Sequence, residues 1–417
     1  MNTNWSALDN AAKLFPAAVS GTETQVFRFT CELYSEIQPS FLQEAAEDTL
    51  DLFPTYRMVL KRGLFWYYLE ESDLTPGVTR ESQKLCRGWN EKEGSCLLFE
   101  VTYFGSRISL EVYHVLSDGT SAMNFLRTLV TKYISRVRGI PEPDTGIDAS
   151  HSQFGDDSYN RYYSGEKKKR PQMDHACRVQ GNRYQGKLLR AITGMVQTEK
   201  ILEAAHRHRT TVTVFLAACM IQAIAENVTQ KEKKKPIVLS VPVNFRTYFP
   251  SQTARNFFGS VYVEYNYNQR DGTFEDILLK TAEDLKNRLT RESLARQLDS
   301  HVAAERNPAT KAVPLFLKKI CLKRVYQRNM KSVTATISNV GAVKLPEVLK
   351  KYIRSFDVCS STNKIQACIC SYEQKMAISF TTPFVSADIE RCFFRRLTGE
   401  GIEVEITTNL PGECDEE

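Results

Sequence analysis

The stretch Tyr113-His114-Val115-Leu116-Ser117-Asp118-Gly119 marks the point at which the periodicity of the chain changes. Residues 107–114, which lead into it, alternate apolar and polar side chains, and this alternation predicts a strand. Residues 120–137, which follow it, space their apolar side chains three and four positions apart, which predicts an amphipathic helix. We therefore expect a tight turn that holds His114 at a strand end, four residues before Asp118, with Gly119 letting the chain enter the helix.

This HxxxDG pattern admits a structural and a catalytic interpretation. In the structural one, His114 is a satisfied histidine at a strand end and Asp118 caps the helix that follows. In the catalytic one, His114 is a general base, because an imidazole with an ordinary pKa of about 6.5 is mostly neutral at pH 7. The spacing alone occurs by chance in many chains of this length, so the rest of the sequence has to decide between them.

Strand and helix patterns continue on both sides of the motif. The sequence predicts strands at 63–69, 96–103, 187–196, 236–243, 257–267, 333–338, 367–371 and 377–381, and further helices at 41–49, 212–226 and 273–291. Residues 138–184 are interrupted by glycine and proline and are interpreted as a connection. These patterns predict an α/β fold (α+β, with mixed sheets) in two halves, residues 1–165 and 180–417, with a ligand site at their interface.

Composition excludes several classes of protein. The 417 residues are 42% hydrophobic and 25% charged, which is ordinary for a globular chain. No run of about 18 apolar residues exists, so we expect no transmembrane segment. The N-terminus has no secretory signal, which favours a cytoplasmic location. A net charge of +6 is small for this length and argues against a nucleic-acid partner. Lysine-rich runs at 167–170 and 231–235 are interpreted as surface loops, or alternatively as a rim for a phosphorylated cofactor.

The cysteines and the other histidines do not indicate a metal site. Eleven cysteines are scattered along the chain without a CxxC pair, so we expect reduced and mostly buried thiols. Cys368 and Cys370 are two positions apart, which would place both on one face of a strand. His206 and His208 have the same spacing beside two arginines, but the sequence offers no third ligand for them.

Further motifs give the chain a family resemblance. The segments that carry it are Trp5, Leu8-Asp9, Phe53-Pro54-Thr55-Tyr56-Arg57, Val241-Pro242-Val243-Asn244-Phe245-Arg246, Arg255-Asn256-Phe257-Phe258-Gly259-Ser260-Val261 and Ile337-Ser338-Asn339-Val340-Gly341. With the HxxxDG motif, they resemble the superfamily of coenzyme-A-dependent acyltransferases, which includes chloramphenicol acetyltransferase, condensation domains and wax-ester synthases. The chain looks most like the bacterial alcohol acetyltransferases of this superfamily. The resemblance covers nearly the whole chain and implies two chloramphenicol-acetyltransferase-like halves with an active-site channel between them.

The resemblance also implies roles for individual residues. His114 would be the catalytic base. Asp118 would turn away from His114 and form a structural ion pair with Arg246, and Gly119 would support the turn. Ser338, Asn339 or a backbone N–H near Gly341 would stabilise the oxyanion of the tetrahedral intermediate, although these residue types also suit a simple turn. We expect Asn256 and Gly259 to shape the strand rather than take part in chemistry.

The expected function is transfer of an acyl group, most simply acetyl, from coenzyme A to an alcohol or amine. Acyl-coenzyme A would be a co-substrate, the acceptor a small molecule, and no bound cofactor or metal is expected. Many condensation domains have two adjacent histidines, whereas this chain has Tyr113 before His114. A condensation-type enzyme that uses carrier-protein thioesters therefore stays as an alternative, as does a non-catalytic homologue that binds an acyl chain or a partner. The sequence does not identify the substrate-binding residues.

Overall fold

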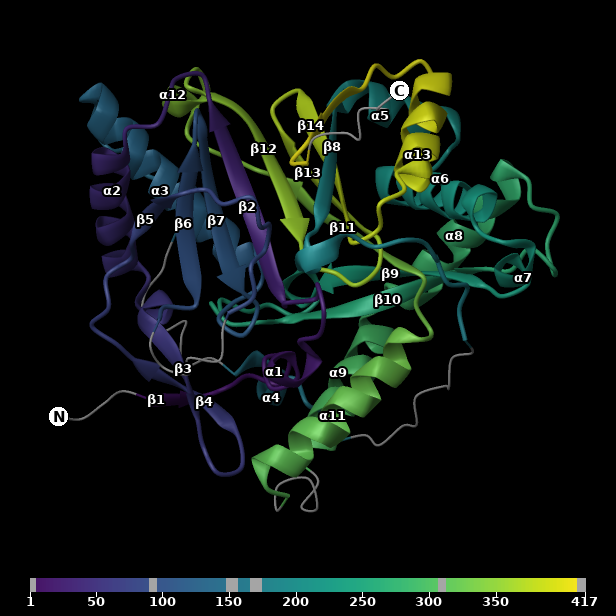
Figure 1. Ribbon diagram of the computed structural model, residues 1–417, viewed down its shortest axis with the longest axis horizontal. Helices are drawn as coiled ribbons and strands as arrows, with labels where there is room; N and C mark the ends of the chain where they lie inside the picture. The colour runs from purple at the N-terminus through teal and green to yellow at the C-terminus, as the bar shows by residue number, and fades with distance from the viewer. Residues whose placement is uncertain (1–4, 90–95, 148–156, 166–174, 307–312, 411–417) are drawn as a thin grey trace.

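Two large sheets and one small sheet organise the protein (Figure 1). The computed structural model describes residues 5–89, 96–147, 157–165, 175–306 and 313–410. The five-stranded sheet has the order β12 (Ile353–Ser360), β2 (Val26–Leu33), β7 (Arg107–Tyr113), β6 (Phe99–Phe104) and β5 (Val78–Arg80). The seven-stranded sheet has the order β10 (Phe258–Tyr265), β9 (Ile237–Asn244), β11 (Ala335–Ala342), β13 (Gln366–Tyr372), β14 (Lys375–Thr382), β8 (Arg190–Gln197) and β15 (Glu405–Thr408). The small sheet has the order β1 (Trp5–Ala7), β4 (Tyr67–Glu71) and β3 (Met58–Arg62).

Helices cover the outer faces of both large sheets. The helices of the first part are α1 (Phe15–Ala18), α2 (Pro39–Leu52), α3 (Gly119–Arg138) and α4 (Ser158–Arg161), and those of the second part are α5 (Thr198–Arg207), α6 (Val212–Asn227), α7 (Gln230–Lys233), α8 (Phe274–Arg288), α9 (Arg291–Arg306), α11 (Leu315–Met330), α12 (Glu347–Lys350) and α13 (Asp388–Gly399). Short 3-10 turns occur at Pro54–Arg57, Gln185–Lys187 and Phe245–Thr247. Figure 1 shows α2 and α3 beside the five-stranded sheet, and α6, α8 and α13 beside the seven-stranded one.

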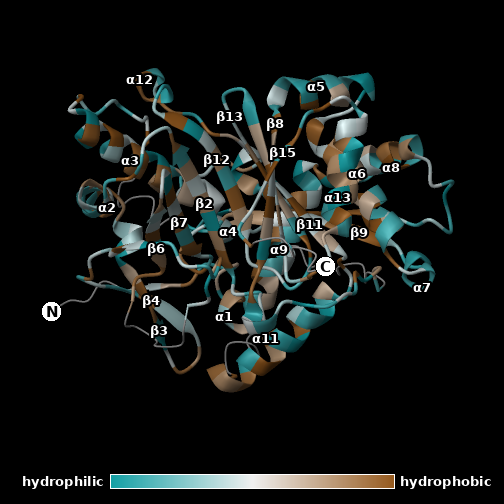
Figure 2. Ribbon diagram, turned by 45° about the horizontal axis from the view of Figure 1, so that its top comes forward, coloured by the Kyte–Doolittle hydropathy of each residue, from teal (hydrophilic) through white to brown (hydrophobic). Residues whose placement is uncertain are grey.

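Two hydrophobic cores join the helices to the sheets, and the architecture is mixed α/β as expected; the first core also includes Cys368, Cys370 and Ala377 from the seven-stranded sheet. The first core joins α2 and α3 to the five-stranded sheet, and the second joins α6, α8 and α13 to the seven-stranded sheet. Helix α6 packs between α8, α13 and the sheet and is apolar on nearly all sides, and the predicted helix at 212–226 is confirmed. In Figure 2 the apolar colouring follows these packed faces.

One strand crosses between the two parts of the chain. β12 follows β11 in the sequence, yet it pairs antiparallel with β2 in the five-stranded sheet, with Ser360 opposite Phe27. The chain then returns to the seven-stranded sheet as β13, which runs parallel to β11. The expected C-terminal half, 180–417, therefore contributes one strand to the sheet of the expected N-terminal half, 1–165. The sequence patterns did not reveal this crossing.

Most other expected elements are present with shifted ends. The expected strand at 63–69 is only partly right, because residues 63–66 form the turn of a hairpin and β4 begins at Tyr67. Gly63 donates its N–H to the carbonyl of Trp66 at 2.9 Å, which closes this hairpin. The described parts of 138–184 contain the short helix α4, while the lysine run at 167–170 lies outside the described residues. No single helix within the described ranges is long and apolar enough to cross a membrane.

Candidate active site

His114 lies where the two parts of the protein meet. It directly follows β7, and its backbone N–H donates to the carbonyl of Gln25 at 2.8 Å. The ring centroids of Phe15 and Phe27, from the first part of the chain, lie 4.8 Å from the imidazole centroid. The ring of Phe258, from the start of β10, lies 5.2 Å away. The imidazole is thus enclosed by aromatic rings from three segments and stays partly exposed.

Asn256 fixes the orientation of the imidazole. Its side-chain oxygen lies 3.0 Å from Nδ1 of His114. Its side-chain nitrogen donates to the carbonyl oxygen of His114 at 3.0 Å and to Oδ2 of Asp9 at 2.9 Å. Because a carbonyl oxygen can only accept, these bonds determine which end of the amide faces the ring. Nδ1 must then carry the proton of a neutral imidazole, and Nε2 carries the lone pair.

Asp9 anchors this arrangement from the N-terminal segment. Its Oδ1 accepts the N–H of Ala12 at 2.7 Å, and its Oδ2 accepts both the side-chain and the backbone N–H of Asn256. Asp9 and Asn256 are buried. Buried polar groups whose hydrogen bonds are all made hold their neighbours in one geometry. Both residues belong to segments that carry the family resemblance, but the sequence gives no sign that they meet His114.

The surroundings keep His114 neutral. Burial lowers the pKa of His114 below its ordinary value, and this effect outweighs Asp118 and the Asn256 hydrogen bond, which favour the protonated ring. A lower pKa means that the neutral form persists to lower pH. The group is therefore in the protonation state that a general base needs.

Asp118 accepts hydrogen bonds from backbone N–H groups and pairs with Arg246; it makes no hydrogen bond with the imidazole among the contacts described. Oδ1 accepts the N–H of Ser121 at 3.2 Å, which caps α3 as the structural interpretation of the motif predicts. Oδ2 accepts the N–H of Phe257 at 3.0 Å and lies 2.6 Å from Nη1 of Arg246. Both carboxylate oxygens are thus occupied at the junction between the parts of the chain, in the arrangement that the resemblance implied.

Arg246 ties together the segment that carries Asn256. Its Nη2 donates to the carbonyl oxygens of Thr253 and Arg255 at 2.8 and 2.7 Å. The pair with Asp118 is largely buried, with side-chain exposures of 13% and 6%.

Gly119 supports the turn less than the resemblance implied, because a Cβ there would meet Phe29 at an ordinary 3.7 Å. Steric packing does not require a glycine at this position.

Ser338 faces the first part of the protein, whereas Asn339 is engaged locally. In the register of the sheet, Ser338 lies opposite Cys368, which belongs to the first hydrophobic core. Side chains of one row share a face, so Ser338 faces the same way. Asn339 donates from its amide to Thr213 Oγ1 at 3.1 Å and accepts the N–H of Gly341 at 3.0 Å, beside a bulge in β11. These bonds use the Asn339 amide and the Gly341 N–H.

The remaining expectations concern cysteines and metals. Cys368 and Cys370 both belong to the first core, which confirms that they share a face of β13. His208 lies at the end of α5 and contacts Glu400 at 3.1 Å. Across the ranges that the structure describes, no group of three or more His, Cys, Asp or Glu side chains is placed to hold a metal ion.

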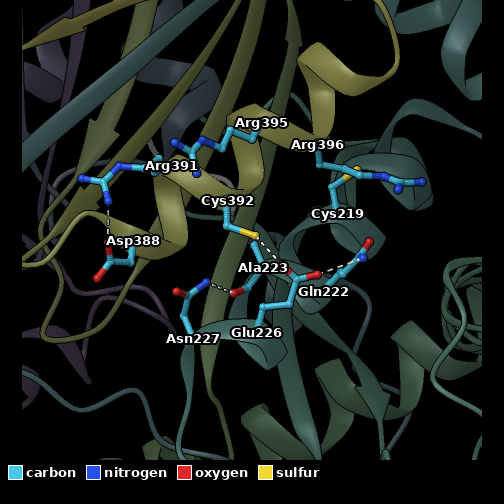
Figure 3. Close-up of a pocket in the computed structure, with 10 residues that line it drawn as sticks. All are labelled: Cys219, Gln222, Ala223, Glu226, Asn227, Asp388, Arg391, Cys392, Arg395 and Arg396. Atoms are coloured by element: carbon cyan, nitrogen blue, oxygen red, sulfur yellow. Dashed lines mark hydrogen bonds and ion pairs between the residues drawn. The ribbon is translucent and has the colours of Figure 1, made fainter.

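A separate hollow of about 520 Å³ lies on the far side of the seven-stranded sheet (Figure 3). It is lined by α6 and α13, where Cys392 contacts Glu226 at 2.8 Å and Arg391 contacts Asp388 at 2.7 Å. Its residues take no part in the network around His114. Three arginines and two carboxylates line it, and of these Arg391 and Asp388 form an ion pair.

Solved structures show which class of fold this is. Polyketide synthase associated protein 5 from Mycobacterium tuberculosis is 16% identical, with a TM-score of 0.58, and the alignment covers 94% of this chain and 96% of that one. TRI3 trichothecene 15-O-acetyltransferase from Fusarium sporotrichioides is 9% identical, with a TM-score of 0.62 and coverages of 95% and 94%. TRI101 from F. graminearum, complexed with ethyl coenzyme A, is 12% identical, with a TM-score of 0.60 and coverages of 97% and 99%. The fold is therefore the one that TRI3, TRI101 and the starter condensation domain of rhizomide synthetase RzmA share.

The sequence comparison is more specific than the fold. A family model described as alcohol acetyltransferase matches residues 146–388, which is more than half of the chain. The chain belongs to the alcohol acetyltransferase family, and this confirms the resemblance drawn from the motifs. No curated protein matches it.

Proposed function

We propose that this protein transfers an acyl group from an acyl-coenzyme A thioester to an alcohol, with His114 as the general base. The observation that carries the proposal is the contact between Asn256 and Nδ1 of His114, which leaves Nε2 free to accept a proton. Membership of the alcohol acetyltransferase family supports the reaction class. TRI101, complexed with ethyl coenzyme A, and TRI3, named as a 15-O-acetyltransferase, support a coenzyme A donor and a hydroxyl acceptor.

The proposed reaction needs one base that acts twice. Nε2 of His114 takes the hydroxyl proton as the acceptor oxygen attacks the thioester carbonyl carbon. The tetrahedral intermediate then collapses, the carbon–sulfur bond breaks, and the coenzyme A thiolate recovers the proton from the imidazolium. General-base assistance of this kind contributes roughly 10²–10⁴ in rate. The hydrogen bond from Nδ1–H to Asn256 would keep the imidazole in the same orientation while Nε2 gains and loses the proton.

Ser338 is the preferred donor to the oxyanion of the intermediate. Among the three groups that the sequence suggested, the Asn339 amide and the Gly341 N–H already have partners. The Ser338 hydroxyl stands on the face of β11 that is turned toward the first part of the protein. An oxyanion needs a donor that is already oriented before reaction, so Ser338 fits this role better than the other two.

Asp118, Arg246 and Gly119 would support the site without touching the substrate. The buried pair of Asp118 with Arg246 fixes the turn after His114 relative to the segment that bears Asn256. Geometry of this kind matters because small displacements of a base cost large factors in rate.

The test is a transfer assay with defined donors. Purified protein is incubated with acetyl-coenzyme A and a panel of alcohols and amines, thiol release is followed with a thiol reagent, and the product is identified by mass spectrometry. We expect ester formation by the wild type and none above background by His114→Ala. His206→Ala, at the exposed end of α5, is the matched control and should keep full activity.

Two other outcomes would replace the proposal. Transfer from a carrier-protein thioester but from no coenzyme A donor would indicate a condensation-type enzyme. Binding of acyl-coenzyme A without turnover toward any acceptor, from either kind of donor, would indicate a non-catalytic homologue.

A further inference from the structure

Helix α11 combines exposed apolar side chains with a uniformly positive charge. Over Leu315–Met330 it carries five basic residues and no acidic one. Phe316, Leu317 and Ile320 in its first turns are 58%, 45% and 49% exposed. Large apolar side chains that gather on a surface mark an interaction site, unlike isolated ones. A basic amphipathic helix is typical of surfaces that bind anionic membranes or partner grooves.

A β-hairpin extends this apolar end of the helix. Leu64 and Phe65, which form the turn between β3 and β4, are 74% and 43% exposed. The carbonyl of Leu64 accepts the N–H of Leu315 at 3.0 Å, and the carbonyl of Phe65 accepts Nζ of Lys318 at 3.1 Å. The hairpin turn thus caps the first turn of α11. We call Leu64, Phe65, Phe316, Leu317 and Ile320 together the apolar tip.

Further contacts make the apolar tip rigid. Nζ of Lys318 also lies 3.7 Å from the ring centroid of Trp66, and Lys318 is 3% exposed. Gly63 is needed for the hairpin, because a Cβ there would meet the carbonyl of Trp66 at 2.6 Å. These contacts hold the hairpin turn against the first turn of α11. Nothing within the described residues covers the side chains of the apolar tip.

The exposed apolar side chains concentrate toward the start of α11 and the basic ones toward its end, with Lys319 and Val325 as exceptions. Phe316 and Ile320 span about 6 Å of axis at 1.5 Å per residue. Lys323, Arg324 and Arg328 begin about one turn farther along, and all three are exposed. Interfacial helices bury their apolar residues roughly 5–10 Å deep, at the boundary between headgroups and acyl chains. A tip inserted to that depth would leave these three cations, which we call the basic collar, level with the headgroups.

The shape of the region favours a bilayer over a protein partner. Figures 1 and 2 show the hairpin turn and the N-terminal end of α11 side by side at one margin of the molecule. A second copy that docked through the same surface would bring two basic helices together, and like charges at an interface are unfavourable. Anionic lipid headgroups instead match the collar in charge, and their acyl chains match the tip.

We propose that the apolar tip and the basic collar dock this protein onto membranes that contain anionic lipids. Helix α11 also packs against α1, and Phe15 of α1 lies against His114, so α1 links the helix that bears the docking surface to the candidate active site. The proposal does not depend on the proposed chemistry, since membrane binding is measured without substrates.

The experiment is flotation of the full-length protein with two kinds of vesicle. One contains phosphatidylcholine alone, and the other contains phosphatidylcholine with phosphatidylglycerol. We expect the wild type to float with the anionic vesicles, to bind the neutral ones at least tenfold more weakly, and to be released by high salt. Each basic residue near an anionic surface contributes about 1 kcal/mol, or roughly fivefold in affinity.

Variants separate the two parts of the surface. Phe65→Ser/Phe316→Ser/Ile320→Ser and Arg324→Glu/Arg328→Glu should each weaken binding to anionic vesicles at least tenfold. The matched controls lie on α8: Leu279→Ser, at a position that is 68% exposed, and Lys286→Glu/Arg288→Glu should bind like the wild type. The melting temperature of every variant is measured, and the charge reversal, at exposed positions only, tests the proposal if the apolar variant does not fold.

Four results would overturn the proposal. The first is no flotation of the wild type with anionic vesicles, and the second is equal flotation of the collar variant and its control. The third is that light scattering shows a dimer which the tip variant converts to a monomer, because a second copy would then cover the tip. Binding of an acidic carrier protein that the same variants abolish, without vesicle binding, would assign the surface to a protein instead.

Discussion

The side-chain oxygen of Asn256 lies 3.0 Å from Nδ1 of His114, and the nitrogen of the same amide contacts the carboxylate of Asp9 at 2.9 Å. These three residues come from the N-terminal segment, the end of β7 and the segment before β10. One amide therefore sets the tautomer of the proposed base and joins both parts of the protein.

Removal of the imidazole should abolish transfer with little effect on folding. His114→Ala should lower kcat/KM by at least about 10²-fold, because general-base assistance is lost. The melting temperature should change by less than about 4 °C, since the ring is partly exposed and water can replace its hydrogen bonds. Steady-state kinetics and calorimetry measure the two effects. Wild-type turnover in this variant would disprove the role of His114.

Removal of the Asn256 side-chain amide should change the pH dependence of the reaction. Asn256→Ala should lower kcat by roughly tenfold, the equivalent of one hydrogen bond of about 1.4 kcal/mol. The hydrogen bond to Asn256 favours the protonated imidazole, so its loss should lower the pKa of His114 further and move the acidic limb of the kcat profile to lower pH. A variant that is slower but keeps the wild-type profile would indicate a purely structural role for Asn256.

The ion pair between Asp118 and Arg246 should contribute to stability as a unit. Asp118→Ala and Arg246→Ala should each cost roughly 3–5 kcal/mol, because either leaves a buried charge without its partner. The double variant should cost clearly less than the sum of the two. Urea unfolding of the four proteins gives the coupling energy, and additive losses would show that the two side chains act independently.

Two glycines near the site should respond differently to a methyl group. At Gly259 a Cβ would overlap the side chains of Gln297 and Phe245, so Gly259→Ala should cost about 1–3 kcal/mol. Gly119→Ala is the matched control, with room for the methyl group, and should stay within about 0.5 kcal/mol of the wild type. Equal losses in the free energy of unfolding for the two variants would mean that steric overlap at Gly259 does not determine the loss of stability.

A half-buried carboxylate in the five-stranded sheet should make stability depend on pH. Burial raises the pKa of Asp357 to about 6, with a contribution from Glu81, against the opposing effects of Arg107 and Arg28. The folded protein therefore holds this proton at pH values where the unfolded chain has lost it, and stability from this group decreases as pH rises from about 4 to 6.

Asp357→Asn should relieve this cost above pH 6. The gain at pH 7 should be at most about 3 kcal/mol, with some reduction because the residue is partly exposed. Urea unfolding between pH 5 and 8 measures it, with Asp388→Asn, at an exposed position, as the control. A gain that is the same at pH 5 and at pH 8 would contradict the titration of Asp357.

The sequence by itself determined the local elements around His114. Alternation before residue 114 and helical spacing after residue 119 each depend on neighbours within a few positions, so β7, the turn and α3 follow from the pattern. The family resemblance then predicted the ion pair between Arg246 and Asp118. The expected strand at 63–69 was partly wrong because aromatic residues favour a strand, whereas the pairing of β3 with β4 places residues 63–66 in the turn between them.

Only the tertiary structure decided which distant segments meet. Nothing local in residues 353–360 distinguishes a strand of one sheet from a strand of the other, and their pairing with β2 depends on the packing of both sheets. For the same reason, the sequence could not show that Asp9 and Asn256 orient His114, or that a hairpin turn caps α11. Hydrogen bonds between residues far apart in the chain form only after the cores bring their backbones together, so no local periodicity encodes them.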